Sequence, residues 1–587
     1  MSIATTARAG TRLTPRMAAH QLRRFARNKT VPKFATRYDR RIRRTASALP
    51  PVSSYRRISP ELATFIGGFY HHSDEQMRDA AKGRFTIMGR TVDFGSVEDI
   101  DWSHRLPDEK DHHLWRMKLA QLEVLHSLVV SDDIAHHDTA VALLESFTAS
   151  RNFAAQHAFA AGWSPYGASH RMLALLSGLA LAARRGTLAA RTWHHFASFL
   201  QVEAAFLWQN IEHDLRNNHT ERNLAALCLY HMATQPVSWS YARTLDREVA
   251  RIISSTVLID GMQIERSAMY QGLTVMSLRI FAACGFLSEA TRALARERGG
   301  AAARALMFLT HRDGQIALFN DSWLDEVPPP AAILKPVPRT HSAALPQAGY
   351  YRVSSGGVDA LLDAGAIGPR WNPGHGHADF LAVEVDVDGR RFIVDPGTSQ
   401  YSTGPQRTYE RSAASHNGPR YAGVEPVEYA GCFKVGRLGH AESLPAESLS
   451  RLSVPAIGGV LRTSTGRCSR VVCALPGGGL AIVDRWESRW PPGVTNLLIP
   501  TEWHLDVDGD TEVRAHCADT TTTITVHSGS VGPVVYASWT RRYMQPEPAL
   551  SITLNPADRC LAFGVGVTDP SEVTAVQTEI DRYLAGW

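Results

Sequence analysis

The spacing of apolar residues changes its period between residues 325 and 346, and this change is the strongest constraint on the fold. Before it, apolar residues recur at three- and four-residue steps, as in Trp115, Leu119, Leu122, Leu125 and Val129, a pattern typical of amphipathic helices. After it, short runs alternate apolar and polar residues between Gly and Pro, as strands do. The chain is therefore expected to fold as helices first and sheets second.

Similar helical faces recur at residues 168–184, 190–209, 221–234, 240–257, 268–285 and 300–310. Short loops separate them, so we expect roughly ten helices in successive antiparallel pairs. No repeat of fixed length is visible, which favours a closed toroid over a repeat array. The predicted fold is α+β and multidomain: an N-terminal (α/α) helical toroid followed by a C-terminal antiparallel β-sandwich.

At 587 residues the chain is too long for one ordinary core. We expect a basic N-terminal arm at 1–58, the toroid at 59–326, a Pro-rich linker at 327–345 and the sandwich at 346–587. The segment Val327–Arg339 within the linker is rich in Pro, so it is predicted to be stiff and extended.

Positive charge is concentrated in the first 60 residues. They hold fifteen Lys and Arg residues and one acid, Asp39, which leaves 47 basic and 56 acidic residues, a net charge of −9, in the rest. A body of that sign excludes a basic nucleic-acid-binding surface. Met17, Leu22 and Phe25 lie among arginines and predict a short amphipathic helix that could rest on an anionic membrane, with turnover unaffected by deletion of the arm. The alternative is a solvated or domain-packed segment.

The seven cysteines are odd in number and scattered without a C-x-x-C pair. They predict core thiols or a reducing compartment rather than a disulfide framework. No run of about twenty apolar residues is present, and the N-terminus has no apolar signal core. As written, the chain is expected to be cytoplasmic. The sequence does not indicate an oligomeric state.

The segment Trp371–Gly418 combines a Gly-rich loop with a predicted hairpin. Its two apolar runs flank Asp388-Gly389, which suits the left-handed positions of a type I′ turn. A two-residue turn places Ala382 opposite Asp395.

Ionisable side chains gather at the ends of this hairpin. His375, His377 and Asp379 precede the first strand, Asp395 follows the second, and His416 lies beyond. Imidazoles and a carboxylate at one rim could form a metal site or a proton-transfer site. With 25 His in the chain, about one H-x-H pair is expected by chance, so the pair alone does not choose between these readings.

Two short motifs stand out in the helical half. In the first, Asn218 can cap a helix with Glu221 three residues on as a capping box, but this leaves the intervening His219 unexplained. In the second, Ser267 would cap a helix and place Tyr270 in its first turn. A tyrosine there is commonly a half-buried packing residue.

Taken in order, these pieces resemble the heparinase II/III family of polysaccharide lyases, from about residue 80 to 430. The matching residues are Leu114-Trp115-Arg116 with Leu119, Trp163-Ser164-Pro165-Tyr166 with Ser169 and Arg171, Asn218-His219, Glu265-Arg266-Ser267-Ala268-Met269-Tyr270, His375-Gly376-His377-Ala378-Asp379, Val394-Asp395-Pro396-Gly397 and Ser415-His416-Asn417. Two departures from the family pattern are Gln271, where His commonly follows the Tyr, and Asn320-Asp321 in place of Gly-Asp.

The resemblance implies a carbon–oxygen lyase that cleaves an acidic, uronate-containing polysaccharide by β-elimination. Asn218, helped by His219, would neutralise the uronate carboxylate in the transition state. The base that takes the C5 proton would be Tyr270 or His219, and the acid that protonates the departing O4 would be Tyr270 or His375. The site is expected where the two domains meet.

The resemblance also implies a zinc ion bound by residues that match His377, Asp395 and His416, a donor set that suits zinc. Its place in the sandwich predicts a structural role, shaping the loop of His375. The implied setting is capsule or exopolysaccharide handling, with the periplasm or cell envelope as the alternative compartment.

Two other classes of function stay open. One is a hydrolase, either metal-dependent at His375, His377 and Asp395 or a toroid glycosidase that uses Asp260 and Glu265. The other is a catalytically silent glycan-binding protein of an envelope-polymer assembly system. Elimination creates a conjugated, ultraviolet-absorbing unsaturated uronate, whereas hydrolysis creates only a reducing end.

Overall fold

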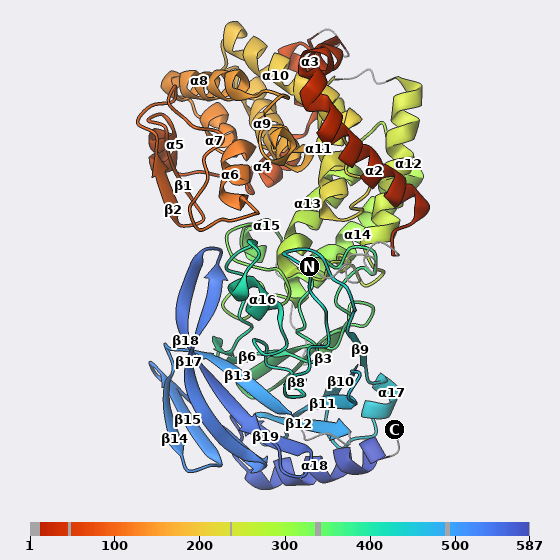
Figure 1. Ribbon diagram of the computed structural model, residues 1–587, viewed down its shortest axis with the longest axis vertical. Coiled ribbons are helices and arrows are strands. Elements are labelled where there is room, and N and C mark those ends of the chain that lie inside the picture. The colour runs from red at the N-terminus through yellow and green to blue at the C-terminus, as the bar shows by residue number, and fades with distance from the viewer. Residues whose placement is uncertain are drawn as a thin grey trace. The chain divides into compact units, whose positions relative to one another are not determined.

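The computed structural model describes residues 12–44, 49–155, 157–234, 238–334, 342–487 and 493–585. These residues form two compact units, shown in Figure 1. The helical unit comprises residues 13–257 and 272–300, and the sheet unit comprises residues 258–271 and 301–585 together with Arg12. A helical region followed by antiparallel sheets confirms the predicted fold class.

The helices begin and end close to five of the six recurring faces that were predicted, whereas the face at 300–310 belongs to a helix that already begins at Glu289. They are α2 (Pro15–Thr30), η1 (Val31–Phe34), α3 (Ala35–Arg44), η2 (Val52–Arg57), α4 (Pro60–Gly67), α5 (Asp74–Ala80), α6 (Leu114–Gln121), α7 (Leu125–Val130), α8 (Ile134–Ser150), η3 (Ala158–Ala160), α9 (Pro165–Arg185), α10 (Ala190–Gln209), α11 (Asn218–Thr234), α12 (Trp239–Thr256), α13 (Ala268–Ala283) and α14 (Glu289–Phe308). A short hairpin of β1 (Arg84–Ile87) and β2 (Arg90–Asp93) interrupts them. The continuous face expected over residues 115–129 is wrong in one respect, because Leu122 has a φ of 51° and ends α6.

Helix α9 is the centre of the helical unit. Ser164 caps its start by accepting a hydrogen bond from the Gly167 N–H, Pro165 occupies the first turn, and Gly186 ends it with a φ of 72°. Nearly every residue between is buried, against α4, α7, α10 and α11. Most of these buried residues are apolar, although Ser169, His170 and Arg171 are buried with them, so the neighbouring helices pack around α9.

The described residues of the sheet unit form three antiparallel sheets. The first has the order β3 (Ser342–Leu345), β4 (Tyr350–Ser355), β5 (Val358–Asp363), β6 (Val383–Val387), β7 (Arg390–Ile393). The second has the order β14 (His504–Asp508), β15 (Glu512–Cys517), β16 (Thr520–Ser528), β19 (Cys560–Val565), β12 (Leu480–Glu487), β11 (Arg467–Ala474), β10 (Ala456–Arg462), β9 (His440–Ser443). The third has the order β17 (Ser530–Arg542), β18 (Gln545–Asn555), β13 (Val494–Pro500), β8 (Pro419–Arg420). Short helices are α15 (Pro330–Ile333), α16 (Pro405–Arg411) and α17 (Ala446–Leu449), and α18 (Pro570–Ala585) is longer.

Four strands of the eight-stranded sheet are buried on both faces, because alternate residues of β10, β11, β12 and β19 enter different cores. Along β12, Leu480 and Ile482 face the larger core, shared with β5 and β6, whereas Ala481 and Val483 face α18. Figure 1 shows α18 lying along this sheet. Burial on both sides explains why the strands read as nearly continuous apolar runs.

The central hairpin forms at the predicted turn with a different register beyond it. Asp388 and Gly389 have φ values of 48° and 83°, as a type I′ turn requires. A bulge after Asp386 then shifts the pairing by one residue. Ala382 and Asp395 lie outside the paired residues, so their predicted pairing is wrong.

The Pro-rich segment contains the short helix α15 at its start, so residues 330–333 are not extended as predicted. Residues 335–341 of this segment lie outside the described residues, as do residues 1–11 and 45–48 of the basic arm. All seven cysteines are free thiols, and six of them are buried.

Among the described residues, no helix is both long enough and apolar enough to cross a membrane.

Candidate active site

One group of candidate residues lies at the start of α11 in the helical unit. The Asn217 Oδ1 accepts a hydrogen bond from the His219 N–H at 3.1 Å, so Asn217 occupies the cap position and Asn218 is the first helical residue. The predicted cap at Asn218 is therefore displaced by one residue. Glu221 accepts a hydrogen bond from the Thr274 hydroxyl at 3.1 Å, which ties α11 to α13.

His219 is held by two neighbours that define its orientation. Its Nδ1 lies 3.2 Å from the Glu212 Oε2, and its ring stacks on Tyr166 with 4.2 Å between centroids. A carboxylate only accepts hydrogen bonds, so Nδ1 carries the proton in this contact. Burial by itself would raise the pKa of Glu212, but the His219 ring and its hydrogen bond lower this pKa below its ordinary value. About a quarter of the His219 side chain is exposed.

Other residues of the motifs that resemble the family pack and form hydrogen bonds beneath this group, inside the helical unit. Arg171 is fully buried and paired with Glu203, with Nη2 and Oε2 2.8 Å apart. Ser169 accepts a hydrogen bond from the Asn223 Nδ2 at 3.0 Å, while the Asn223 Oδ1 accepts one from the Glu212 N–H at 2.9 Å. These residues connect α9 to the loop before α11.

The second group lies in the sheet unit and includes Tyr270. The Ser267 Oγ accepts a hydrogen bond from the Tyr270 N–H at 3.3 Å, which confirms Ser267 as the cap of α13 with Tyr270 in its first turn. The Tyr270 hydroxyl lies 3.5 Å from the His375 Nδ1 and 3.2 Å from the Tyr401 hydroxyl. Burial raises the pKa of Tyr401 well above its ordinary value, so Tyr401 keeps its proton and can donate it to Tyr270.

Asp321 is the hub of this second group. It accepts hydrogen bonds from the His375 Nδ1 at 2.9 Å and the His377 Nε2 at 2.9 Å. Arg407 binds it with both terminal nitrogens, at 2.5 and 2.7 Å. Burial alone would raise the pKa of Asp321, but Arg407 and the two imidazoles hold it well below the usual range. The two histidines are thereby fixed with protons toward Asp321.

The loop between the two histidines requires a glycine. A Cβ at Gly376 would come within 2.0 Å of the Ile367 carbonyl oxygen. Arg411 donates hydrogen bonds to the Gly376 carbonyl at 3.0 and 3.2 Å, and the Asn320 Oδ1 accepts one from the His377 N–H at 3.0 Å. The loop is therefore held from both sides.

Gln271, where the family commonly has His, is a structural residue here. Its Oε1 accepts a hydrogen bond from the Gln263 N–H at 2.6 Å, and its Nε2 donates to the carbonyls of Gly261 and Ala302, both at 2.9 Å. These contacts fix the loop before α13.

The predicted zinc ligands meet only in part. The His416 Nδ1 lies 2.7 Å from the Asp395 Oδ2, and the rings of His377 and His416 are 5.4 Å apart. Among the residues that the structure describes, the buried His377 Nδ1 and His416 Nε2 have no hydrogen-bond partner, which fits two metal donors. Burial lowers the pKa of His377 to about 3, so its lone pair is available. Asp395, however, binds the opposite nitrogen of His416, the position of a carboxylate that orients a ligand.

Within the part of the chain that the structure describes, no three His, Cys, Asp or Glu side chains converge as a metal-binding group. The zinc site therefore stays a prediction, and no chemical step is assigned to a metal.

The structure thus brings Tyr270 together with His375 and, separately, positions Asn218 next to His219. The two groups belong to different units, so their predicted meeting in one cleft stays a prediction. Sequence reasoning missed Glu212, Tyr401 and Arg407 and gave Asp321 no role. Tyr401, Arg407 and Asp321 act through partners distant in sequence, whereas Glu212 lies only seven residues from its partner His219. The available signal was Asn320-Asp321, the point of departure from the family pattern.

Comparison with known proteins bears on the fold and on the C-terminal half of the chain. Residues 337–539 match the family described as heparinase II/III-like, C-terminal. The fold is similar to a crystal structure of heparinase III, with a TM-score of 0.61 and 14% identity over 84% of this chain and 85% of that chain. It is also similar to a mutant heparan sulfate lyase from Pedobacter heparinus, with a TM-score of 0.55 and 15% identity over 88% and 87%. No curated protein sequence matches. Residues 337–539 are thus similar to the heparinase II/III-like C-terminal family, and the chain has a heparinase III-like fold.

Proposed function

We propose that the protein is a polysaccharide lyase that cleaves a 4-linked uronate by β-elimination. In this reaction a base takes the C5 proton, the C4–C5 double bond forms, the C4–O4 bond breaks and O4 takes up a proton. The observation that carries the proposal is the hydroxyl of Tyr270, placed 3.5 Å from the His375 Nδ1 and 3.2 Å from the Tyr401 hydroxyl. Similarity to structures named as heparan sulfate lyase and heparinase III supports it.

Proton transfer is assigned to the group around Tyr270. A phenol in water titrates near pH 10, so a tyrosine base needs donors beside it. Tyr401, which retains its proton, supplies one such donor. His375 is held by Asp321 through its Nδ1, has its Nε2 3.8 Å from the Glu265 Oε1, and is the candidate acid for O4.

Charge neutralisation is assigned to the group around Asn218. Removal of the C5 proton places negative charge on the uronate carboxylate, which donors fixed in advance stabilise most effectively. Asn218 and His219 are the candidate donors. Glu212 binds the His219 Nδ1 and so directs the Nε2 edge of the ring away from the Glu212 carboxylate. His219 is the alternative base.

The hydrolase alternative has less support. The Asp260 carboxylate accepts hydrogen bonds from the N–H groups of Met262, Gln347 and Ala348, at 3.2, 2.8 and 2.9 Å. A carboxylate occupied by three backbone donors is a loop cap and a weak general acid. A metal-dependent hydrolase is also disfavoured, because His375 and His377 share Asp321 while Asp395 pairs with His416.

The test is Tyr270→Phe, which removes one hydroxyl. We expect ultraviolet-absorbing product from a panel of uronans to form at least about 10²-fold more slowly. The matched control is Tyr350→Phe, which loses a buried hydrogen bond of 2.7 Å to the Arg266 carbonyl in the same unit. Unsaturated product at the wild-type rate from Tyr270→Phe would assign the base elsewhere, and new reducing ends without ultraviolet absorbance would indicate a hydrolase.

The substrate is proposed to be a uronan of low sulfation, of the kind found in capsules or exopolysaccharides. Beyond residue 60 the sequence has a net charge of −9, which disfavours binding of heavily sulfated chains. A ranking of turnover from unsulfated to heavily sulfated uronans measures this preference.

A peripheral membrane contact is a second proposal, supported by exposed apolar side chains of α2 and η1. Leu22, Phe25 and Phe34 are 69%, 58% and 62% exposed in a strongly basic segment, and the Lys29 ammonium lies 4.3 Å from the Phe25 ring centroid. Phe25→Ser is expected to weaken binding to anionic vesicles. The matched control is Trp239→Ser, an aromatic side chain 71% exposed beneath Arg243. Equal binding by both variants would refute the contact.

A further inference from the structure

Helix α2 has an unusual distribution of side chains. Its apolar residues Leu22 and Phe25 are exposed, whereas Arg24 and Arg27 turn toward the helical unit and are partly buried. Only Met17 is a fully buried apolar residue of this helix. Burying the guanidinium of an arginine costs folding free energy unless hydrogen-bond acceptors or carboxylates are placed to bind it. The inner face of α2 is therefore built to meet specific polar partners.

These partners lie on the loop that precedes α11, residues 210–217. The Arg24 Nη2 forms an ion pair with the Asp214 Oδ2 at 2.6 Å, and the Asp214 side chain is only 4% exposed. The Arg27 Nη1 donates a hydrogen bond to the Asn210 Oδ1 at 2.7 Å. In addition, the Asn210 Nδ2 donates to the hydroxyl of Tyr38 on α3 at 2.9 Å. Two anchors thus bracket residues 211–213.

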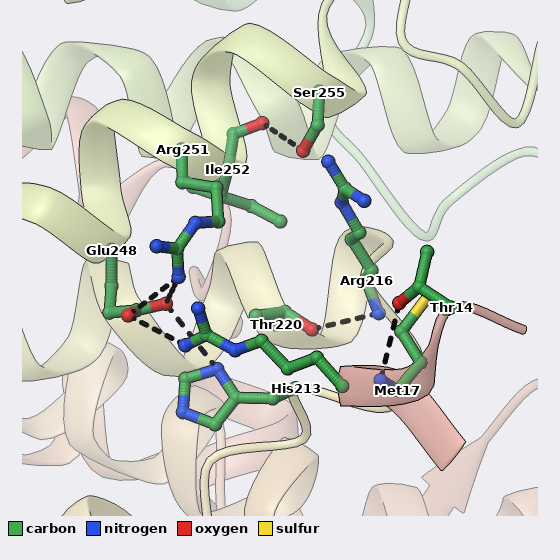
Figure 2. A pocket seen from close by; sticks show the side chains of 10 residues that line it. Thr14, Met17, His213, Arg216, Thr220, Glu248, Arg251, Ile252 and Ser255 are labelled. Atoms are coloured by element: carbon green, nitrogen blue, oxygen red, sulfur yellow. Dashed lines mark hydrogen bonds and ion pairs between the residues drawn. The ribbon is translucent and has the colours of Figure 1, made fainter. Parts of the chain in front are cut away.

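A third anchor lies at the start of α2. Figure 2 shows Glu248 of α12 between Arg251 and His213, in a pocket that Met17 and Thr14 also line. Arg16 donates a hydrogen bond to Glu248 at 2.9 Å, and the His213 Nδ1 lies 3.6 Å from the same carboxylate. Glu248 therefore joins α2 to the middle of the loop.

The bracketed loop carries Glu212, the partner of His219. Besides that contact, the Glu212 carbonyl accepts a hydrogen bond from the Thr220 hydroxyl at 2.6 Å. Arg24 and Arg27 are also among the charges that lower the pKa of Glu212. The path from α2 to His219 is thus continuous: the arginines hold the loop, the loop holds Glu212, and Glu212 orients the imidazole.

We propose that α2 is a positioning element of the active site, in which Arg24 and Arg27 hold the 210–214 loop so that Glu212 stays on the His219 Nδ1. This inference rests on the proposed lyase function. It reverses the expectation that residues 1–58 are dispensable for turnover. The geometry of a catalytic imidazole depends on the group that binds its second nitrogen, so loss of the anchors is expressed as lost turnover.

The experiment compares Arg24→Ala and Arg27→Ala, singly and together, with Arg23→Ala and Lys29→Ala on exposed positions of the same helix, all in the full-length protein. We expect kcat on the best uronan to fall about 10-fold for each single variant and up to about 100-fold for the double variant, with KM within about twofold of wild type. Arg24→Lys should recover most of the kcat because it restores the charge opposite Asp214. Both controls should retain wild-type kcat.

Hydrogen exchange of residues 210–217 supplies a readout that needs no turnover. Faster exchange in this segment of the double variant, with unchanged exchange in α9, supports the anchoring. Unchanged exchange and kcat in the double variant would overturn the proposal. Equal losses of kcat in the control variants, or no recovery with Arg24→Lys, would reduce α2 to a general stability element and also overturn it. If wild type produces no unsaturated uronate from any polymer, the lyase proposal fails, and exchange still decides whether α2 holds the loop.

Discussion

Substitution of Asp321 by Asn tests the hub of the site with almost no change of shape. Asp321 and Arg407 are 0% and 2% exposed, and Arg407 donates two hydrogen bonds to the carboxylate. Asparagine keeps one oxygen and replaces the other with an NH₂ group, which cannot accept the second hydrogen bond. The guanidinium is left buried without its counter-charge.

The expected cost follows from this burial. Removing one partner of a buried ion pair destabilises proteins by about 3–5 kcal/mol. In a unit of this size each kcal/mol shifts the melting temperature by about 2 °C, so the expected shift is roughly 6–10 °C. Catalysis should suffer independently, because the NH₂ group of the asparagine cannot accept a hydrogen bond, so either His375 or His377 loses the acceptor that fixes its proton. A loss of about 10²-fold in kcat is expected.

The pH dependence has a defined sign. The pKa of Asp321 is held well below its ordinary value, so its contribution to stability is present above the unfolded pKa of about 3.9 and is lost as pH falls through the lower folded pKa. The stability difference between wild type and Asp321→Asn should therefore be constant from pH 7 to about 4 and narrow only below that.

Melting temperature by circular dichroism and kcat measured well below the melting transition separate the two effects. Asp484→Asn is the matched control, because Asp484 and Arg470 form another fully buried pair with two contacts of 2.7 Å. Both variants should lose similar stability, but only Asp321→Asn should lose kcat. Equal losses of kcat, or a melting temperature of Asp321→Asn within about 1 °C of wild type, would refute the reasoning.

Three further outcomes are expected. Despite the opposing effect of burial, Asp386 and Glu384 raise the pKa of His311, with contacts of 2.8 and 2.7 Å. The stability that this ionised histidine contributes is therefore complete below about pH 6.5 and is lost as pH rises through the raised folded pKa. His311→Gln should flatten this decline when the free energy of unfolding in urea is measured against pH, and an unchanged slope would contradict the assignment. Gly376→Ala should lower both the melting temperature and kcat, because its Cβ would meet the Ile367 carbonyl oxygen at 2.0 Å; wild-type values for both would show that the loop adapts freely. Elemental analysis of protein purified without chelator should find about one zinc per chain, lost in His377→Ala and His416→Ala; absence of zinc from the wild type would contradict the predicted ligand set.

The sequence alone determined the elements whose formation depends on near neighbours. Ser267 could be recognised as a cap because its partner, the Tyr270 N–H, is three residues away. Asp388-Gly389 could be recognised as a turn because only those two residues need left-handed angles. Helical and strand periods are likewise local, which is why the order of helices and sheets could be predicted.

Tertiary structure decided everything that depends on distant partners. Asp321 became the hub only because residues near 375 and 407 reach it, and sequence spacing carries no record of that approach. The bulge after Asp386 shifted the hairpin register for a similar reason, since strand alignment is fixed by packing across the sheet as well as by the turn. The role of α2 was also hidden, because a basic amphipathic pattern does not show which face turns inward. Ion pairs to Asp214 and Glu248 select that face, and they exist only after the chain has folded.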